Sequence, residues 1–421
     1  MTADPPSRAA DLFATALAHH QAGRLDLAET LYHDLLRADP RHGMVLANLA
    51  VLHQQRGALD TAEHWYQRAL ALQRTPELLS NLAMLRRARG DLRAAERLLR
   101  EALFLRPDFP DALYNLGTTL IEADRPAEAI DPLTKRARDP AAGADVHANL
   151  ARALHAVGRT AEALPHGRHA LLLKDAQACQ SFRSRSGQAL ARAPAPPYDA
   201  SRTHQNVIAF SLWGTRATYV DGAIANANLA RSLYPGWTCR FYLDESVPGA
   251  ARDALTRAGA QLMMMPRATP PYGLFWRFFA ADDPSVRYFL CRDTDSRLNA
   301  QEAEAVAAWL RSGQSFHIMR DAPFHTELML AGLWGGVGGR LGGIRNAIDQ
   351  YYRAGDHRWI DQDFLRAEVW PRIRELTLIH DSCYDLFGAQ PFPRVGRLSP
   401  PHHVGAGYVI TEREGESTRP G

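Results

Sequence analysis

The pattern of apolar and polar positions divides the chain into two halves. In the first half, small apolar residues recur every 33 or 34 residues, whereas in the second half short apolar runs alternate with helical patterns. The recurring small residues are Ala28, Ala62, Ala95, Ala129 and Ala163. A fixed period of this length is typical of an array of helical hairpins, in which each hairpin buries its apolar face against the next.

Further positions recur in phase with these alanines. The turn positions are Gly23, Gly57, Gly90, Asp124 and Gly158, and the bulky positions of the second helix are Tyr32, Tyr66, Leu99 and Leu133. Pro40, Pro107 and Pro140 lie near the ends of their repeats. Glycine permits the left-handed backbone of a tight turn, alanine permits close helix packing, and proline ends a helix. The pattern therefore predicts two helices in each repeat.

This arrangement resembles the tetratricopeptide repeat, in which a turn glycine, a small alanine, an aromatic residue and a terminal proline follow in the same order. The resemblance covers residues 9–177. It implies an all-α superhelix of five repeats whose concave groove binds a protein or peptide. The fifth repeat departs from the pattern at Gly167 and Lys174, and terminal repeats are commonly atypical.

Composition marks the limits of a second domain. We expect the polar ends of the chain, residues 1–8 and 411–421, to be disordered. Residues 178–205 combine a predicted capping helix with the proline-rich run 193–197, which predicts an extended spacer. The second domain is therefore expected to cover residues 206–410.

The second domain opens with a predicted buried strand. Residues 207–213 form an apolar run, and a helical pattern follows as far as Pro235. Strands at 239–243 and 261–265 flank a predicted helix at 248–258. Strands that alternate with helices predict a doubly wound, parallel α/β sheet, which binds ligands at the carboxyl ends of its strands.

The carboxyl ends of two predicted strands carry candidate ligand-binding residues. Ser211 and Trp213 lie at the end of the first strand, and Asp293-Thr294-Asp295 follows the apolar run 288–291. Two carboxylates at a strand end suit a hard divalent cation, which would hold a nucleotide-sugar diphosphate. The alternative is an acidic surface turn with no ligand.

Neighbouring segments complete a second family resemblance. An aromatic segment containing Arg277 precedes the D-x-D strand, and 328–333, 361–365 and the strand end at 378–380 follow it. Together they resemble glycosyltransferases of the GT-A fold, which is Rossmann-like and doubly wound. The segments 328–333 and 361–365 sharpen the resemblance toward the retaining group that includes glycogenin and bacterial lipooligosaccharide galactosyltransferases. The resemblance covers about 206–395.

The resemblance implies a metal-dependent transfer of sugar from a UDP- or GDP-sugar to an acceptor. It implies Mn²⁺ or Mg²⁺ as the cofactor, with Asp293, Asp295 and His380 as its ligands. It implies donor contacts from Asp293, Arg277, Gly332 and Asp361, and positions facing the donor sugar for Gln362 and Asp363. Asp321 is the candidate for binding sugar hydroxyls or the acceptor.

Some positions depart from this family. Arg292 and Arg297 flank the D-x-D, and Ala331 replaces an asparagine. The C-terminal His-x-x-Gly-x-x-Lys-Pro-Trp segment is missing, because no lysine follows Lys174. The pair 402–403, both histidines, is a second candidate for a metal ligand.

Each candidate also has a structural interpretation. His380 could belong to a turn at a strand end, 361–363 could begin a helix, and Arg277 could form a structural ion pair. For the whole protein, the alternative is a non-catalytic interaction protein with a degenerate α/β scaffold. A metal-independent transferase with two Rossmann domains is disfavoured, because only about 200 residues follow the spacer.

Bulk composition excludes further classes of protein. A hydrophobic content of 46% and a charged content of 23% are typical of soluble globular proteins. The net charge of +3 disfavours a nucleic-acid-binding surface. The four cysteines form no C-x-x-C pair, which predicts reduced thiols. No apolar run is long enough to span a membrane, so we expect a cytoplasmic protein with at most peripheral membrane contact.

Overall fold

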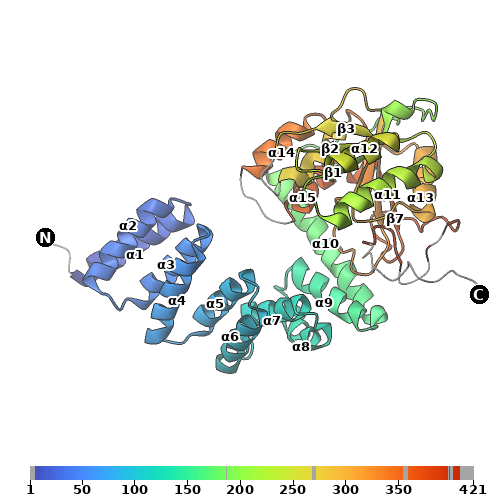
Figure 1. Cartoon of the computed structure of the whole chain (residues 1–421). Helices are drawn as coiled ribbons and strands as arrows, with labels where there is room; N and C mark the ends of the chain where they lie inside the picture. Colours follow the sequence, from blue (N-terminus) through green and yellow to red (C-terminus); the bar gives the residue numbers. More distant parts are fainter. Residues whose placement is uncertain are drawn as a thin grey trace, which may run out of the picture. The chain divides into compact units, whose positions relative to one another are not determined.

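The computed structural model describes residues 5–185, 187–267, 272–353, 359–396, 398 and 402–407. The chain forms two compact units, Met1–Ala163 and Leu164–Gly421, and each has a hydrophobic core of its own. Figure 1 shows the paired helices of the first unit and the sheet of the second.

The first unit is built from helical hairpins, with the first helix of each packed against the second. Its described helices are α1 (Pro5–Gln21), α2 (Leu25–Ala38), α3 (Gly43–Gln55), α4 (Leu59–Leu72), α5 (Pro76–Ala88), α6 (Leu92–Leu105), α7 (Pro110–Glu122), α8 (Pro126–Ala137) and α9 (Ala144–Ala156). Helix α1 thus begins inside residues 1–8, which the sequence predicted to be disordered.

The recurring positions explain why the hairpins repeat. The alanines that recur in the sequence are all fully buried: Ala28, Ala62, Ala95, Ala129 and Ala163. The turn residues have positive φ angles, which glycine adopts at little cost: Gly23, Gly57, Gly90, Asp124 and Gly158. Small residues at the helix contacts and left-handed turns between the helices therefore set the period of the array.

The second unit contains a seven-stranded mixed sheet. Its strands are β1 (Asn206–Leu212), β2 (Thr238–Leu243), β3 (Gln261–Met264), β4 (Tyr288–Arg292), β5 (Phe316–Arg320), β6 (Trp334–Val337) and β7 (Thr377–Asp381). The strand order is β3-β2-β1-β4-β6-β5-β7, and β6 is antiparallel to both of its neighbours. The other neighbouring pairs are parallel.

Helices cover both faces of the sheet (Figure 1). The helices of this unit are α10 (Thr160–Ser184), α11 (Ala217–Leu233), α12 (Gly249–Arg257), α13 (Ala300–Ser312), α14 (Ile344–Tyr352), α15 (Ile360–Phe364) and α16 (Trp370–Ile373). Residues of α11, α12 and α13 share one core cluster with β1, β2 and β4, whereas α10, α14 and α15 belong to a cluster on the opposite face. Helix α10 begins at Thr160, in the first unit, and continues to Ser184.

Short irregular helices complete the unit. They are the 3₁₀ helices η1 (Thr203–Gln205), η2 (Tyr272–Ala281) and η4 (Arg374–Leu376), and the π-helical turn η3 (Leu365–Val369). The segment η2 is the aromatic, Arg277-containing segment identified in the sequence, and most of it is buried.

Two elements differ from the pattern read in the sequence. The sheet is not wholly parallel, because no helix separates β5 from β6 and a short connection of this kind suits antiparallel strands. The apolar run 328–333 is not a strand but a buried loop that leads into β6. Its apolar composition reflects burial and not pairing in the sheet.

The proline-rich segment packs along the second unit. Leu190 N–H donates a 2.9 Å hydrogen bond to Arg372 O, and Arg340 Nη2 donates one of the same length to Ala191 O. The hydroxyl of Tyr288 donates to Pro196 O. An extended backbone leaves its carbonyl groups free to accept such bonds. The two compact units divide between Ala163 and Leu164, within α10, whereas the sequence predicted a spacer between the domains at 178–205.

Candidate functional site

The strand order reverses between β1 and β4. From β1 the chain proceeds through β2 to β3 on one side, and then returns to form β4 on the other side of β1. In open α/β sheets, ligands bind at the carboxyl ends of the strands at such a reversal. Trp213 directly follows β1, and Asp293 directly follows β4. The first candidate residues of the two strands therefore flank the reversal point.

Arg277 joins two of the sequence motifs at this point. Its guanidinium contacts the Asp293 carboxylate through Nη1 and donates a 2.8 Å hydrogen bond from Nη2 to Asp361 Oδ2. The backbone N–H of Arg277 donates to Ser211 Oγ at 3.0 Å. The D-x-D and D-Q-D motifs, which are distant in sequence, thus share one arginine that is fixed to the end of β1.

Two of the three charged groups in this cluster are shielded from water, Arg277 and Asp361. Arg277 is 5% exposed and Asp361 is 4% exposed. Burial alone would lower the pKa of Arg277, but Asp293 and Asp361 more than offset that effect and raise it. Burial raises the pKa of Asp361, and the charge of Arg277 opposes this rise. The arginine therefore compensates two carboxylates, one of which is almost completely buried.

Gly332 gives the Asp293 carboxylate its space. A Cβ atom at Gly332 would lie 1.9 Å from Asp293 Oδ2, which no real side chain could tolerate. Gly222 of α11 has the same role on the other side of the turn, because a Cβ there would lie 2.0 Å from Thr294 O. Gly332 was predicted from the sequence, whereas Gly222 was not.

Side chains and backbone groups fix the D-x-D turn. Ser296 Oγ donates to Asp293 O at 3.1 Å, and Arg297 Nη1 donates to Thr294 O at 3.2 Å. Burial, followed by the nearby charge of Asp293, raises the pKa of Asp295. The second contribution indicates that the two carboxylates repel one another and would gain from a shared cation.

His380 does not join Asp293 and Asp295 in a metal site with three protein ligands. It is 2% exposed on β7, and its Nδ1 is 2.8 Å from Nε2 of His317 on β5. Burial lowers the pKa of His380 to about 4. Among the described residues, no group of three or more His, Cys, Asp or Glu side chains could hold a metal ion. His380 is thus not brought together with Asp293 and Asp295.

The two aspartates fit a cation that is shared with a substrate. Asp293 retains 44% exposure of its side chain, although one oxygen contacts Arg277. Mg²⁺ is commonly held by one or two carboxylates together with substrate phosphates and water. Asp293 and Asp295 match that donor set, whereas a site made of three protein ligands does not match the described residues.

Gln362 and Asp363 lie at the start of α15 and are half-buried. Asp363 contacts Arg366, and Arg366 Nη1 is 3.1 Å from Glu327 Oε2. Glu327 also contacts Lys174, which is 3% exposed on α10. A chain of alternating charges therefore fixes Asp363 to α10, a connection that the sequence did not suggest.

Asp321 follows β5, and hydrogen bonds hold its carboxylate in place. Oδ2 accepts from Gln301 Nε2 at 3.0 Å and from Val404 N–H at 2.8 Å, and Oδ1 accepts from the Ser382 hydroxyl. A sugar hydroxyl would have to replace one of these donors or share an oxygen with it. The predicted substrate role of Asp321 stays a prediction.

The C-terminal segment 402–407 approaches the D-x-D turn. Gly407 forms an antiparallel bridge with Ser296, and Val404 is fully buried against Leu333. The His403 ring lies 4.9 Å from the His325 ring. The two histidines at 402–403 were candidates from the sequence, but the position of this segment beside the turn was not predicted. The glycines at 405 and 407 were the only hint in this segment that its backbone packs closely against other residues. A Cβ atom at Gly405 would lie 2.8 Å from Leu333.

The two arginines that flank the D-x-D have structural contacts. Arg292 is 1% exposed, and its Nη1 donates to Cys291 O at 2.8 Å and to Trp334 O at 3.1 Å. Its Nε donates to Glu302 Oε1 at 2.5 Å. Arg292 therefore belongs to the core, whereas Arg297 braces the turn itself.

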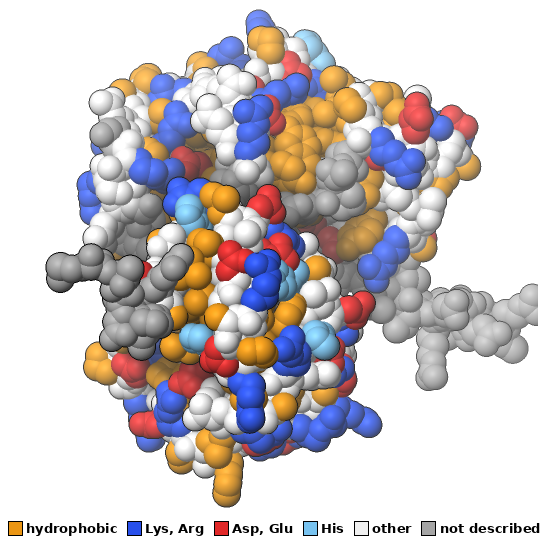
Figure 2. Space-filling view, turned by 90° about the vertical axis from the view of Figure 1, so that its left-hand side faces the viewer, with side chains coloured by type: hydrophobic (Ala, Val, Ile, Leu, Met, Phe, Trp, Pro, Cys, Tyr) orange, Lys and Arg blue, Asp and Glu red, His pale blue; other side chains and the backbone are white. Residues whose placement is uncertain are grey.

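Charge is mixed on the visible surface. On the face shown in Figure 2, Lys and Arg side chains are interspersed with Asp and Glu among the coloured residues. This face has no continuous basic stripe of the kind that follows a nucleic-acid backbone. None of the described helices combines the length and the apolar character needed to cross a membrane.

Comparisons with known proteins identify the repeats. One tetratricopeptide repeat model matches residues 6–77 and 80–145, and a second matches residues 144–166. No curated protein matches the chain.

Solved structures of three other proteins resemble part of the chain at low identity. MamA is 20% identical with a TM-score of 0.36, over 42% of this chain and 99% of that chain. The pilF protein of Pseudomonas aeruginosa is 23% identical with a TM-score of 0.37, over 43% and 87%. YrrB, titled a TPR protein with an unusual peptide-binding site, is 16% identical with a TM-score of 0.34, over 38% and 84%. The N-terminal part of the chain consists of tetratricopeptide repeats, which indicate protein–protein interaction or scaffolding.

Proposed function

We propose that the α/β unit is a glycosyltransferase that uses a nucleotide sugar and a divalent cation. The observation that carries this proposal is the bridge that Arg277 forms between Asp293 and Asp361 at the reversal point of the sheet. Arg277 holds the partly exposed Asp293 carboxylate in place at a strand end, where a divalent cation could join that carboxylate to the diphosphate of a donor.

Roles for the remaining residues follow from their positions. Asp293 and Asp295 would hold Mn²⁺ or Mg²⁺ together with diphosphate oxygens, and Arg277 would keep Asp293 oriented. Trp213, half-buried at the end of β1, would contact the nucleoside. Gln362 and Asp363, half-buried at the start of α15, would face the donor sugar. His380 is not included as a ligand, because it pairs with His317.

A bound divalent cation would supply charge stabilisation to the departing nucleoside diphosphate. The protein would then need no strong acid at the leaving group. Its own contribution would be positional: Ser211 fixes the backbone of Arg277, and Gly332 leaves room for the Asp293 carboxylate. Both features would keep Arg277 and Asp293 in place, so that a bound donor is already oriented for transfer. Less entropy would then be lost in reaching the transition state.

The repeat array would recruit a protein, either as the acceptor or as a partner. The alternative is a non-catalytic interaction protein. One observation favours this alternative: both carboxylate oxygens of Asp321 already accept hydrogen bonds from the protein, which leaves less capacity for a substrate. Thermal unfolding separates the two functions. A nucleoside diphosphate with Mn²⁺ should raise the melting temperature of a transferase by mass action, whereas no response to any nucleotide favours the scaffold.

Hydrolysis of a panel of UDP- and GDP-sugars, with and without Mn²⁺, tests the catalytic proposal. The protein should hydrolyse at least one donor, and Asp295→Ala should lower that rate by about a hundredfold or more. Asp221→Ala, which removes an exposed carboxylate from α11, is the matched control and should leave the rate unchanged. Equal rates in the wild type and in Asp295→Ala would exclude the proposed site.

A further inference from the structure

The first compact unit, the repeat array, contains a pocket between the second helices of two neighbouring hairpins. The first helices of several successive repeats pack against one another, as α3 does with α5 and α5 does with α7. The pocket between α2 and α4 has a volume of about 560 Å³. It is lined by Thr30, His33, Leu36, Arg37, Trp65 and Arg68. All six lining residues belong to the second helices of two successive repeats, α2 and α4.

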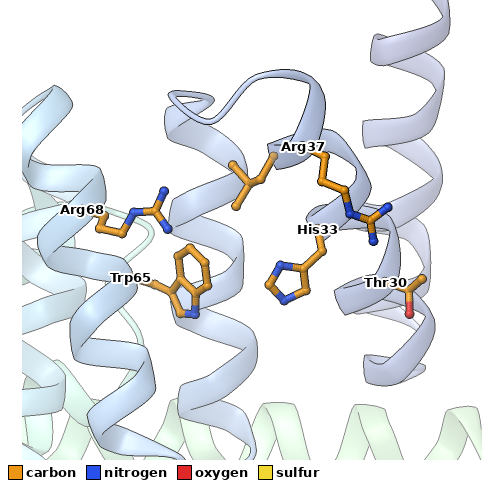
Figure 3. Close-up of a pocket in the computed structure, with 6 residues that line it drawn as sticks. Thr30, His33, Arg37, Trp65 and Arg68 are labelled. Atoms are coloured by element: carbon orange, nitrogen blue, oxygen red, sulfur yellow. The ribbon is translucent and has the colours of Figure 1, made fainter.

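Opposite walls of the pocket carry aromatic and basic groups. Figure 3 shows Trp65 and Arg68 on one wall, and His33, Arg37 and Thr30 on the other. The Arg68 guanidinium lies 4.7 Å from the centre of the Trp65 ring, and the His33 ring lies 5.8 Å from the Trp65 ring. Stacking of a guanidinium on an indole holds the cation in place without neutralising it.

The lining contains basic groups and no acidic side chain. Arg37 is already paired with Asp34 at 2.6 Å, and His33 lies 3.9 Å from Glu29, which also contacts Arg56. Arg68 donates to Pro40 O at 3.5 Å and has no carboxylate partner among the described residues. Arg68 is therefore the cation in this pocket that remains available to an anionic ligand.

The pocket also has apolar character. Leu36 is 8% exposed and forms part of the lining, and the half-buried Trp65 ring forms a wall. The Trp65 indole N–H has no acceptor among the described residues. A pocket of a few hundred Å³ with an apolar body and a few polar groups can hold about two or three side chains.

We propose that this pocket binds a short acidic segment of a partner protein that carries one apolar side chain. The apolar side chain packs against Trp65 and Leu36, and a carboxylate of the segment pairs with Arg68. This proposal does not depend on any activity of the α/β unit. The array would thus hold a partner through the pocket between α2 and α4.

Fluorescence anisotropy of a labelled Glu-Glu-Phe-Glu-Glu peptide tests the proposal on the full chain. The peptide should bind, and Arg68→Glu should weaken its affinity by about tenfold or more, because an attraction becomes a repulsion. Arg93→Glu, on the exposed surface of α6, is the matched control and should bind as the wild type does. A Gln-Gln-Phe-Gln-Gln peptide, which lacks the carboxylates, should bind with an affinity lower by about tenfold or more.

Tryptophan fluorescence locates the bound peptide. Trp65 is the only tryptophan among residues 1–163, so Trp65→Phe should abolish a peptide-induced change in emission that the wild type shows. Circular dichroism of each variant checks that the array remains helical. Equal binding by Arg68→Glu and Arg93→Glu, or equal binding of the two peptides, would overturn the proposal. Displacement by inorganic phosphate at a concentration equal to that of the peptide would also overturn it, in favour of a small-anion site.

Discussion

Arg277 donates a 2.8 Å hydrogen bond to Asp361 although 84 residues separate them in the sequence. Because both side chains are almost fully buried, removing one leaves the charge of the other without compensation. We therefore expect Arg277→Met to destabilise the α/β unit by about 3–5 kcal/mol. Urea unfolding followed by tryptophan fluorescence measures this loss, since seven of the eight tryptophans lie after residue 163.

The double variant Arg277→Met/Asp361→Asn provides the control for that experiment. Removal of both charges from the buried pair should recover part of the lost stability, because an unpaired carboxylate no longer remains there. An unchanged unfolding midpoint in Arg277→Met would show that the bridge between the two motifs does not stabilise the unit.

Gly332→Ala tests the packing of the candidate site. The new Cβ atom would lie 1.9 Å from Asp293 Oδ2, so the carboxylate must move. We expect a destabilisation of about 1–3 kcal/mol and a loss of nucleotide binding. In the control variant Gly249→Ala, the nearest atom is Arg252 Nη2 at 3.8 Å, and neither property should change. Normal nucleotide binding by Gly332→Ala would show that the position of the Asp293 carboxylate does not matter for nucleotide binding.

Buried histidines predict how the stability of the α/β unit depends on pH. Burial lowers the pKa of His325 to about 3, and its Nδ1 accepts a 3.0 Å hydrogen bond from Asp321 N–H. Above about pH 6.5 this histidine is neutral in both states. As the pH falls below that value, the unfolded chain gains a proton that the folded chain excludes, so stability is lost.

The expected result is a lower urea midpoint at about pH 5 than at about pH 7.5. His325→Asn should reduce this pH dependence, because an amide oxygen can accept the Asp321 N–H without titrating. The same pH dependence in the variant and in the wild type would assign the effect to other groups, such as His380, whose pKa burial lowers to about 4.

The repeat array should depend on Glu63. This residue is 9% exposed on α4, contacts Arg86 of α5, and accepts a 2.8 Å hydrogen bond from Arg89, the residue that follows α5. Glu63→Gln should destabilise the array by about 1–3 kcal/mol, since it removes a charge that two arginines of the next repeat share. Circular dichroism during thermal unfolding measures the change.

Asp131→Asn is the matched control for Glu63→Gln. Asp131 pairs with Lys135 at 2.8 Å, but both side chains are more than half exposed, and such pairs contribute about 0–1 kcal/mol. Equal losses of stability in the two variants would show that burial of the inter-repeat pair has no special effect.

The array could be predicted from the sequence because its information is local and repeated. The period of the alanines and turn residues fixes both helices of every hairpin, and these positions are buried or left-handed as expected. The strands β1 and β4 were also predicted, because each is a mostly apolar run that ends in a polar residue or a turn.

The parts that were not predicted depend on contacts between distant residues. The pairing of His380 with His317 follows from the register of β5 and β7, which periodicity alone does not fix. The bridge between Ser296 and Gly407 and the buried contact of Lys174 with Glu327 likewise join remote segments. The run 328–333 has the composition of a buried strand, but it is a loop in which Gly332 passes close to Asp293.

Titration calorimetry with UDP and GDP tests the central proposal most directly. In the presence of Mn²⁺, at least one nucleotide should bind to the full chain, and affinity should fall by about tenfold or more without the metal. Asp295→Asn should produce a similar loss in the presence of the metal, whereas Asp221→Asn should bind normally. Binding that is independent of both Mn²⁺ and Asp295, or the absence of binding by either nucleotide, would contradict the proposed donor site.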